Sequence, residues 1–142
     1  MFQGLPRAMS QEPQRPRIGC GAAILDGEGR LLLVKRVKNP EADHWGVPGG
    51  KLDWGEAARA CAEREIREEL GIDIEASRVL AVTDMVADDY HWVAITYAVE
   101  AFEGEPAIQE AHAIHEWGWF PLDALPSPLT AATRDAVAAL RD

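Results

Sequence analysis

The order of strand-like and helix-like segments in the sequence predicts an α+β domain. Short runs rich in aliphatic, β-branched and aromatic residues are typical of strands, and one segment carries apolar residues at helical spacing. The resulting order is β-β-α-β-β-β-α, which combines both kinds of element in one fold. The predicted strands cover residues 18–25, 30–38, 79–85, 92–102 and 117–120, and the predicted helices cover residues 56–70 and a segment from Ser127 or Thr130 to Leu140.

The first two strands are predicted to form a hairpin. Residues 18–25 (IGCGAAIL) are small and apolar, as in a buried strand, and residues 30–38 (RLLLVKRVK) are β-rich before they become basic. Residues 26–29 (DGEG) have the composition of a turn. Two such runs joined by a short turn favour antiparallel pairing.

The two helices are predicted from their apolar stripes and their end signals. Gly71 follows the last apolar position of the first helix, where glycine commonly adopts the left-handed conformation that ends a helix. Ser127 and Thr130 are both suitable N-caps for the second helix. The apolar stripe of the first helix consists of Ala58, Cys61, Ala62, Ile66 and Leu70.

Length, charge and hydropathy limit the class of protein. Residues 1–16 are rich in proline and glutamine without periodicity, so we expect a flexible tail followed by one domain over residues 17–142. The net charge of −10 argues against nucleic acid as a partner. No run resembles a membrane span or a signal peptide, and we expect a cytoplasmic protein. The two cysteines, Cys20 and Cys61, are expected to be buried free thiols.

Three acidic residues on one helical turn are the strongest functional signal. Glu65, Glu68 and Glu69 stand at i, i+3 and i+4, which places them on one face of a helix. Like charges at this spacing repel, so helix stability does not explain them. A divalent cation between the carboxylates would, because hard cations such as Mg²⁺ prefer oxygen ligands.

Residues 50–72 (GKLDWGEAARACAEREIREELGI) match the pattern G-x5-E-x7-R-E-U-x-E-E-x-G-U, in which U is a bulky aliphatic residue. The chain therefore resembles the Nudix hydrolases. The resemblance implies an α/β/α sandwich with a mixed β-sheet between helices. It also implies metal-dependent hydrolysis of a diphosphate bond. The single domain with short loops is similar to the MutT-type enzymes, which convert a nucleoside triphosphate (NTP or dNTP) to the monophosphate and diphosphate.

The resemblance assigns metal and catalytic roles within this motif. Glu65, Glu68 and Glu69 are the implied Mg²⁺ ligands, with Mn²⁺ as a substitute, and the backbone carbonyl of Gly50 is a further ligand. One of the glutamates also serves as the general base. Members of the family differ on which one, and we favour Glu65 for a combined metal and base role.

The remaining candidates near the metal site are two further residues of the motif and two acids outside it. Glu56 and Arg64 are expected to form a supporting ion pair that aims Glu65. Residues 104–106 (GEP) resemble a turn that precedes an accessory acid in MutT-type enzymes, and Glu110 lies at the matching offset. Glu110 is thus a candidate metal ligand or base, with Glu116 as the alternative.

Basic and aromatic residues supply candidates for substrate binding. Arg36 matches a phosphate-contacting arginine of MutT-type enzymes, and Lys51 directly follows Gly50. Aromatic rings can stack on a nucleobase. The candidates for stacking are Tyr90, His91, Trp92 and Trp45.

The substrate itself stays open between several hypotheses. An NTP or dNTP is the leading one, and ADP-ribose or another nucleoside diphosphate derivative is the alternative. A ligand sensor without turnover is a hypothesis of another class. The segment 125–130 (LPSPLT) lacks the asparagine with which MutT-type enzymes read oxidised guanine, so 8-oxo-dGTP is not the expected substrate. The expected partner is a small nucleotide, and the resemblance also allows a homodimer.

Overall fold

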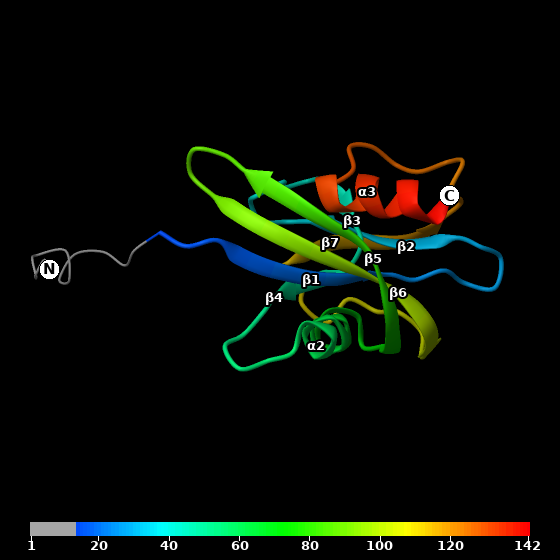
Figure 1. The fold of residues 1–142 in the computed structure, drawn as a ribbon. Coiled ribbons are helices and arrows are strands. Elements are labelled where there is room, and N and C mark those ends of the chain that lie inside the picture. The colour runs from blue at the N-terminus through cyan, green and yellow to red at the C-terminus, as the bar shows by residue number, and fades with distance from the viewer. Residues whose placement is uncertain (1–13) are drawn as a thin grey trace, which may run out of the picture.

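The computed structural model describes residues 14–142, which form two β-sheets with a helix on either side (Figure 1). One sheet has the strand order β4-β1-β6-β5, and the other has the order β3-β2-β7. The fold class predicted from the sequence is confirmed. The strands are β1 (Arg17–Ala23), β2 (Leu31–Arg36), β3 (Trp45–Gly46), β4 (Gly49–Lys51), β5 (Asp73–Val86), β6 (His91–Glu103) and β7 (Ile114–Phe120), and the helices are α2 (Ala58–Leu70) and α3 (Ala131–Leu140).

The predicted hairpin between the first two strands is wrong. β1 pairs in parallel with β6 and antiparallel with β4, whereas β2 belongs to the other sheet. The turn does form, since the Asp26 side chain accepts hydrogen bonds from the backbone of Glu28 and Arg30. Beyond this turn, the two segments form only an isolated antiparallel bridge between Leu25 and Leu31, and they then enter different sheets. Each strand is buried and finds its partners from distant segments, which a local pattern does not reveal.

Helix α2 begins at Ala58, two residues later than predicted. Glu56 instead closes a loop, because its backbone N–H donates to the Asp53 carbonyl and its side chain accepts from the Asp53 N–H. The predicted end is confirmed: Gly71 is left-handed at φ 73° and donates its N–H to the carbonyl of Arg67. The buried face of α2 carries the predicted stripe from Cys61 to Leu70.

β5 and β6 form a long antiparallel pair that exceeds the predicted strands at both ends. Register shifts interrupt β5 between Glu75 and Ala81 and increase its twist. β5 lies at the edge of its sheet, and α2 satisfies part of that edge. Glu63 accepts from the N–H of Ala76, and Arg59 donates to the carbonyl of the same residue.

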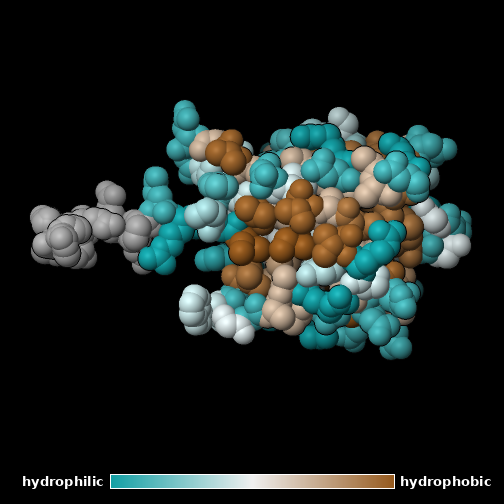
Figure 2. Space-filling view, viewed as in Figure 1, coloured by the Kyte–Doolittle hydropathy of each residue, from teal (hydrophilic) through white to brown (hydrophobic). Residues whose placement is uncertain are grey.

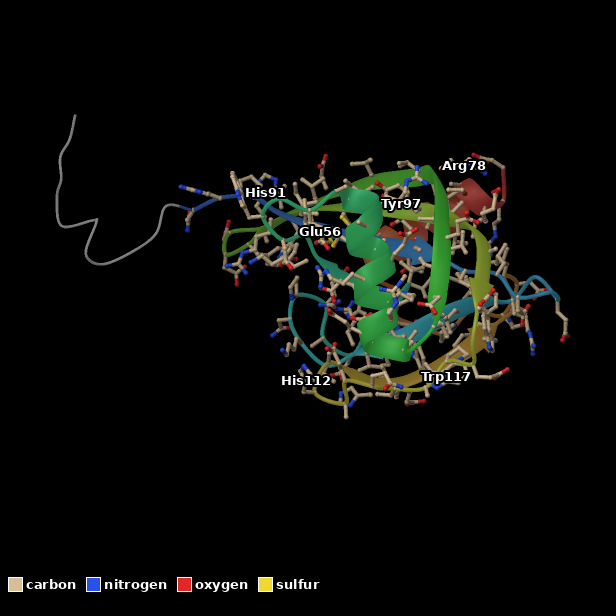
Figure 3. All side chains as sticks on the ribbon, turned by 90° about the horizontal axis from the view of Figure 1, so that it is seen from below. Glu56, Arg78, His91, Tyr97, His112 and Trp117 are labelled. Carbon is tan, nitrogen blue, oxygen red and sulfur yellow. The ribbon has the colours of Figure 1, made fainter. Side chains whose placement is uncertain are left out.

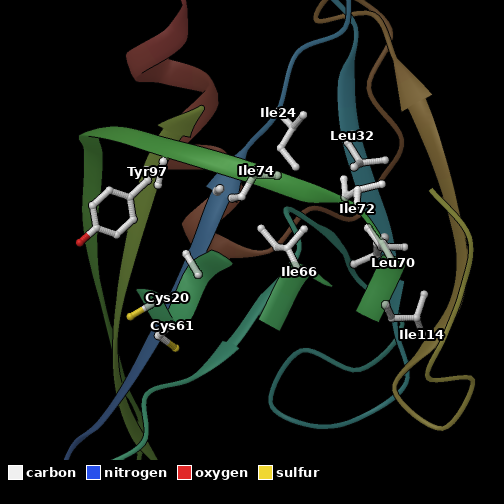
Figure 4. Close-up of a cluster of buried hydrophobic side chains, with 14 residues drawn as sticks. Cys20, Ile24, Leu32, Cys61, Ile66, Leu70, Ile72, Ile74, Tyr97 and Ile114 are labelled. Carbon is white, nitrogen blue, oxygen red and sulfur yellow. The ribbon is translucent and has the colours of Figure 1, made fainter. Parts of the chain in front are cut away.

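The main core lies between α2 and the two sheets (Figure 4). Ile66 and Leu70 of α2 are fully buried there against Ile24 and Leu32. Cys20 and Cys61 are buried and free, as predicted. A second cluster beneath α3 includes Leu31, Leu33 and Val137.

Helix α3 starts after Thr130, the second of the two predicted caps. The Thr130 hydroxyl accepts a hydrogen bond from the backbone N–H of Thr133 at 3.2 Å. Most of the predicted tail, residues 1–13, lies outside the described residues, and residues 14–16 precede β1 without regular structure.

The surface is mostly polar, with one apolar band across the face shown in Figure 2. Ile18, Val79 and Val82 are among the exposed apolar residues of β1 and β5. No helix within residues 14–142 is long and apolar enough to cross a membrane.

We expect Ile66→Ala to lower the free energy of unfolding by about 2–5 kcal/mol, because Ile66 is fully buried and its truncation leaves a cavity. Val82→Ala serves as the control, since Val82 is 60% exposed and loses little packing. Urea denaturation of both variants measures the difference. Equal losses would contradict the placement of Ile66 in the core.

Candidate active site

A cavity of about 510 Å³ lies beside α2 and is lined by both sheets and the loops that join them. This volume is within the range of small-molecule sites. Figure 3 looks onto α2 from below, with Glu56 near one end of the helix and His112, in the loop before β7, toward the other. The cavity wall contains Glu65 and Glu69 of α2 and Glu110 of that loop.

The three predicted acids of α2 do not share one environment. Glu69 is buried, with its Oε1 atom 3.1 Å from the backbone N of Gly49, which donates to it. Glu65 is half-buried and lines the cavity with Glu69. The side chain of Glu68 is 47% exposed, and its Oε1 atom accepts from Arg64 at 3.2 Å. The structure thus brings Glu65 and Glu69 together and leaves Glu68 at the surface beside them.

Burial and mutual repulsion act on the carboxylates in the cavity. Burial, the charge of Glu65 and the charge of Glu110 raise the pKa of Glu69 to about 8, against the N–H of Gly49 and the charge of Arg36. Burial also raises the pKa of Glu65, and the charges of Glu68 and Glu110 add to this while Arg64 opposes it. The surrounding side chains therefore do not fully balance the negative charge that these acids carry when they are ionised.

The glycine pair before α2 permits a close approach of backbone to side chain. A Cβ atom on Gly50 would lie 2.2 Å from the Cδ atom of Glu65. A Cβ atom on Gly49 would instead lie 2.4 Å from the backbone oxygen of Cys20. Gly50 therefore makes room for the Glu65 carboxylate, whereas Gly49 makes room for the pairing of β4 with β1. The Gly50 carbonyl also accepts a weak hydrogen bond from the Cys61 thiol at 3.8 Å.

The predicted ion pair of Glu56 and Arg64 is present. Arg64 donates to Glu56 through Nε at 2.6 Å and through Nη2 at 2.9 Å, which is a bidentate arrangement. The Arg64 hydrogen bonds hold the pKa of Glu56 at about 2, well below its ordinary value. Arg64 also donates to the carbonyl of Lys51 and lies 3.4 Å from Glu65. The pair thus connects the loop after β4 to the acids of α2.

Of the two accessory acids, only Glu110 reaches the cavity. Its loop is tied to α2 because the backbone N of Gln109 donates to the carbonyl of Glu69 at 2.8 Å. Glu116 lies on β7 opposite Lys35 and is exposed. Within the described residues it is not part of the cavity wall.

The predicted substrate-binding residues fall into different places. Arg36 and Lys51 line the cavity, and Trp92 lines its outer end, where the guanidinium of Arg17 stacks 5.8 Å from the Trp92 ring. Tyr90 lies in an adjoining outer groove, not in the cavity. Trp45 packs edge-on against Phe120 at 5.1 Å, so its ring belongs to the core.

Sequence reasoning missed several residues of the cavity wall. Arg17, Met85 and Thr96 enter it from three strands whose neighbours are set by β1–β6 and β5–β6 pairing. Glu41, in the loop between β2 and β3, was also missed. No local spacing marks these residues, because their proximity follows from strand register.

A hard divalent cation fits the donor set of this cavity. Glu65, Glu69 and Glu110 offer only oxygen atoms. Burial, together with the repulsion from neighbouring carboxylates, raises the pKa values of Glu65 and Glu69, and a bound cation would relieve that repulsion. The side chains are not preassembled, since no group of three acidic, histidine or cysteine side chains within residues 14–142 stands close enough for a ready metal site. The acids would therefore converge on a cation as it binds.

The mixed sheet, the antiparallel sheet beside it, the flanking helices and the acidic helix after a glycine pair define a Nudix fold. Residues 15–140 match the family model described as "NUDIX domain", so the chain belongs to this family and is a Nudix hydrolase. A crystal structure of a MutT NUDIX hydrolase from Burkholderia pseudomallei is 50% identical and superimposes with a TM-score of 0.84. The alignment covers 89% of this chain and 99% of the B. pseudomallei chain.

A further relative and a further solved structure carry the names of two different nucleotide compounds. The "Putative 8-oxo-dGTP diphosphatase 2" of Mycobacterium tuberculosis is 37% identical over 106 residues, which span 66% of this chain and 73% of the relative. The NUDIX domain of Shewanella oneidensis NrtR, solved with ADP ribose, has a TM-score of 0.72 at 21% identity. The alignment covers 99% of this chain and 97% of the NrtR chain. At this level of identity the likeness shows the fold alone.

We expect Gly50→Ala to reduce hydrolase activity while the protein stays folded. The new methyl group would displace the Glu65 carboxylate, which is the flexible end of a side chain. Gly49→Ala is the matched variant, because its methyl group meets the backbone of β1 and should cost about 1–3 kcal/mol of stability. Thermal unfolding and activity measured on both variants distinguish the two effects. Loss of stability in Gly50→Ala as large as in Gly49→Ala would contradict this division.

We expect the Glu56–Arg64 pair to stabilise the protein in a defined pH window. The folded pKa of Glu56 is about 2, below the ordinary value of 4.5, so its contribution is complete above pH 4.5 and is lost as the pH falls toward 2. The stability difference between the wild type and Glu56→Gln should shrink across this interval. Denaturation at several pH values measures it, and a constant difference would contradict the pairing.

Proposed function

We propose that this protein hydrolyses a nucleoside triphosphate, NTP or dNTP, to the monophosphate and diphosphate with Mg²⁺ or Mn²⁺ as cofactor. One observation carries the proposal: Glu65, Glu69 and Glu110 come from two distant segments to the wall of one nucleotide-sized cavity. Their shared excess of negative charge suits a site that binds a cation together with an anionic phosphate.

The protein's own residues divide the work. Glu65, Glu69 and Glu110 hold the cation, and the carbonyl of Gly50 is a further candidate ligand. When bound, the cation supplies positive charge for the phosphate oxygens and lowers the pKa of a water. Arg36 and Lys51 at the cavity wall then bind and orient the phosphate chain.

The general base is assigned to Glu65. Burial raises its pKa, which makes the carboxylate a stronger base than an exposed glutamate, and the carboxylate lies against Gly50 at the cavity wall. Arg64, held by Glu56, sits 3.4 Å from Glu65 and keeps the carboxylate oriented. Glu68 accepts a hydrogen bond from Arg64, so it supports the same group, and it is the candidate for an outer ligand of the cation.

Two classes of substrate are candidates, and they differ in the group that hydrolysis releases. The triphosphate is favoured because the cavity of about 510 Å³ suits one nucleotide. ADP-ribose is the second candidate, because a domain of the same fold binds it. The name of the M. tuberculosis relative adds 8-oxo-dGTP to the compounds for comparison, although this chain lacks the asparagine expected in segment 125–130.

We expect Glu69→Gln to lower Mg²⁺-dependent turnover by about 100-fold or more, since it removes a charged ligand from the site. Glu63→Gln is the matched control on the same helix, because Glu63 accepts from the Ala76 N–H and a glutamine oxygen keeps that bond. Turnover of NTPs, dNTPs, 8-oxo-dGTP and ADP-ribose is followed by chromatography of the products.

The products decide between the substrates. Monophosphate plus diphosphate supports the triphosphate assignment, whereas AMP plus ribose 5-phosphate supports ADP-ribose. Full activity of Glu69→Gln would refute its role at the metal site. Absence of turnover with every compound and both metals would refute the proposed function.

A further inference from the structure

Glu41 places a carboxylate in the wall of the active-site cavity, away from the acids of α2. Its Oε2 atom accepts a hydrogen bond from the backbone N of Ala131, the first residue of α3, at 2.8 Å. Glu41 lines the same cavity as Glu65 and Glu69. α2 and α3 lie on opposite sides of the sheets (Figure 1), so Glu41, bound to the start of α3, reaches this cavity from a different part of the fold than the acids of α2.

The loop that carries Glu41 is held firmly. Arg36 donates from Nε to the carbonyl of Pro40 at 3.1 Å, and the backbone N of His44 donates to the carbonyl of Glu41. Glu41 has a φ of 63° and Asp43 a φ of 65°, a conformation that is costly for residues other than glycine. Such strain persists only where the surroundings impose it, and the hydrogen bond from Ala131 then fixes the carboxylate of Glu41 on this loop.

One oxygen of this carboxylate remains available. Oε2 is engaged by Ala131, while Oε1 has no hydrogen-bond or ion-pair partner among residues 14–142. An ionised carboxylate only accepts hydrogen bonds, and its two oxygens offer about four acceptor positions. The group that it suits is therefore an N–H donor, not a phosphate.

We propose that Glu41 determines specificity by accepting hydrogen bonds from N–H groups on the edge of the substrate's nucleobase, the pattern that guanine offers. This inference rests on the proposed nucleotide hydrolysis. The inference places the phosphates at Glu65, Glu69 and Glu110 and the base against Glu41, since all four residues line one cavity, to which Thr130 and Ala132 at the start of α3 also contribute. A site that hydrogen-bonds a polar edge rejects an analogue that lacks it, because the protein group is then left unpaired.

Glu41 also caps α3, so the experiment must separate base recognition from capping. Glu41→Gln serves this purpose, because the glutamine oxygen still accepts from Ala131 while its amide presents N–H groups in place of the free oxygen. The two nucleotides compared are GTP, with imino and amino donors, and purine riboside 5′-triphosphate, which has neither.

The expected result is a change in the ratio of two KM values. The wild type should bind GTP about 10- to 100-fold better than the purine analogue, the size of one hydrogen bond to a charged group. Glu41→Gln should remove this preference by raising KM for GTP, with a smaller change for the analogue. Asp43→Asn is the control in the same loop, because Asp43 is exposed, contacts His115 and lies outside the cavity wall.

A binding measurement keeps this inference apart from the proposed function. Calorimetric titration with GMP and purine riboside 5′-monophosphate gives the same ratio without turnover. Loss of the preference in Glu41→Gln supports the inference even if no nucleotide is hydrolysed, which would refute the proposed function alone. A wild type without preference, parallel changes for both ligands in Glu41→Gln, or no binding of either ligand would overturn the assignment of Glu41.

Discussion

The close approach of β4 to β1 on one side and to α2 on the other is the constraint on which the site depends. Gly49 touches the backbone of β1, and Gly50 touches the carboxylate of Glu65. A methyl group at Gly49 would press against the backbone of β1, whereas one at Gly50 would displace the Glu65 carboxylate. Because α2 is pressed against this strand, Glu69 and Glu65 are withdrawn from water and still keep access to the cavity. Their raised pKa values follow from that burial.

The charged residues at positions 64–69 of α2 differ in how far their charge is balanced by neighbours. Arg64 is satisfied by the bidentate contact with Glu56 and by Glu68, and the low pKa of Glu56 reflects this. Glu65 and Glu69 repel each other and Glu110, with Arg64 and Arg36 as partial compensation. Stable pairing on the outer side of the helix holds the acids of the inner side in place. The unbalanced negative charge therefore lies in the cavity, where it can attract a cation.

The cavity wall combines chemically different groups. Acids of α2 line it together with Arg36 and Lys51, which suits a metal ion and a phosphate chain. Glu41, bound to the start of α3, lines it as well. Arg36 contacts the loop of Glu41, and its charge opposes the rise in the pKa of Glu69, so this residue interacts with both groups. Chemistry and base selection can therefore change separately, since they depend on different segments of the chain.

The sequence by itself determined those features whose spacing is local. The helix of the motif and its left-handed end at Gly71 follow from contacts within one segment. The pairing of Glu56 with Arg64 was implied by the resemblance of residues 50–72 to the Nudix motif, and it is present. For α3 the sequence offered Ser127 and Thr130 as caps, and the structure selected Thr130. All of these contacts are short in sequence, so a local pattern is enough to indicate them.

Tertiary structure alone decided how the strands pair and which side chains meet in the cavity. The parallel pairing of β1 with β6 replaced the expected hairpin, and it brought Arg17 against Trp92. The same packing placed Glu68 at the surface, Trp45 in the core, and Glu41 against α3, 90 residues away in sequence. These outcomes depend on burial and on strand register between distant segments. Local spacing cannot predict them, because each such contact is set by the packing of the whole fold.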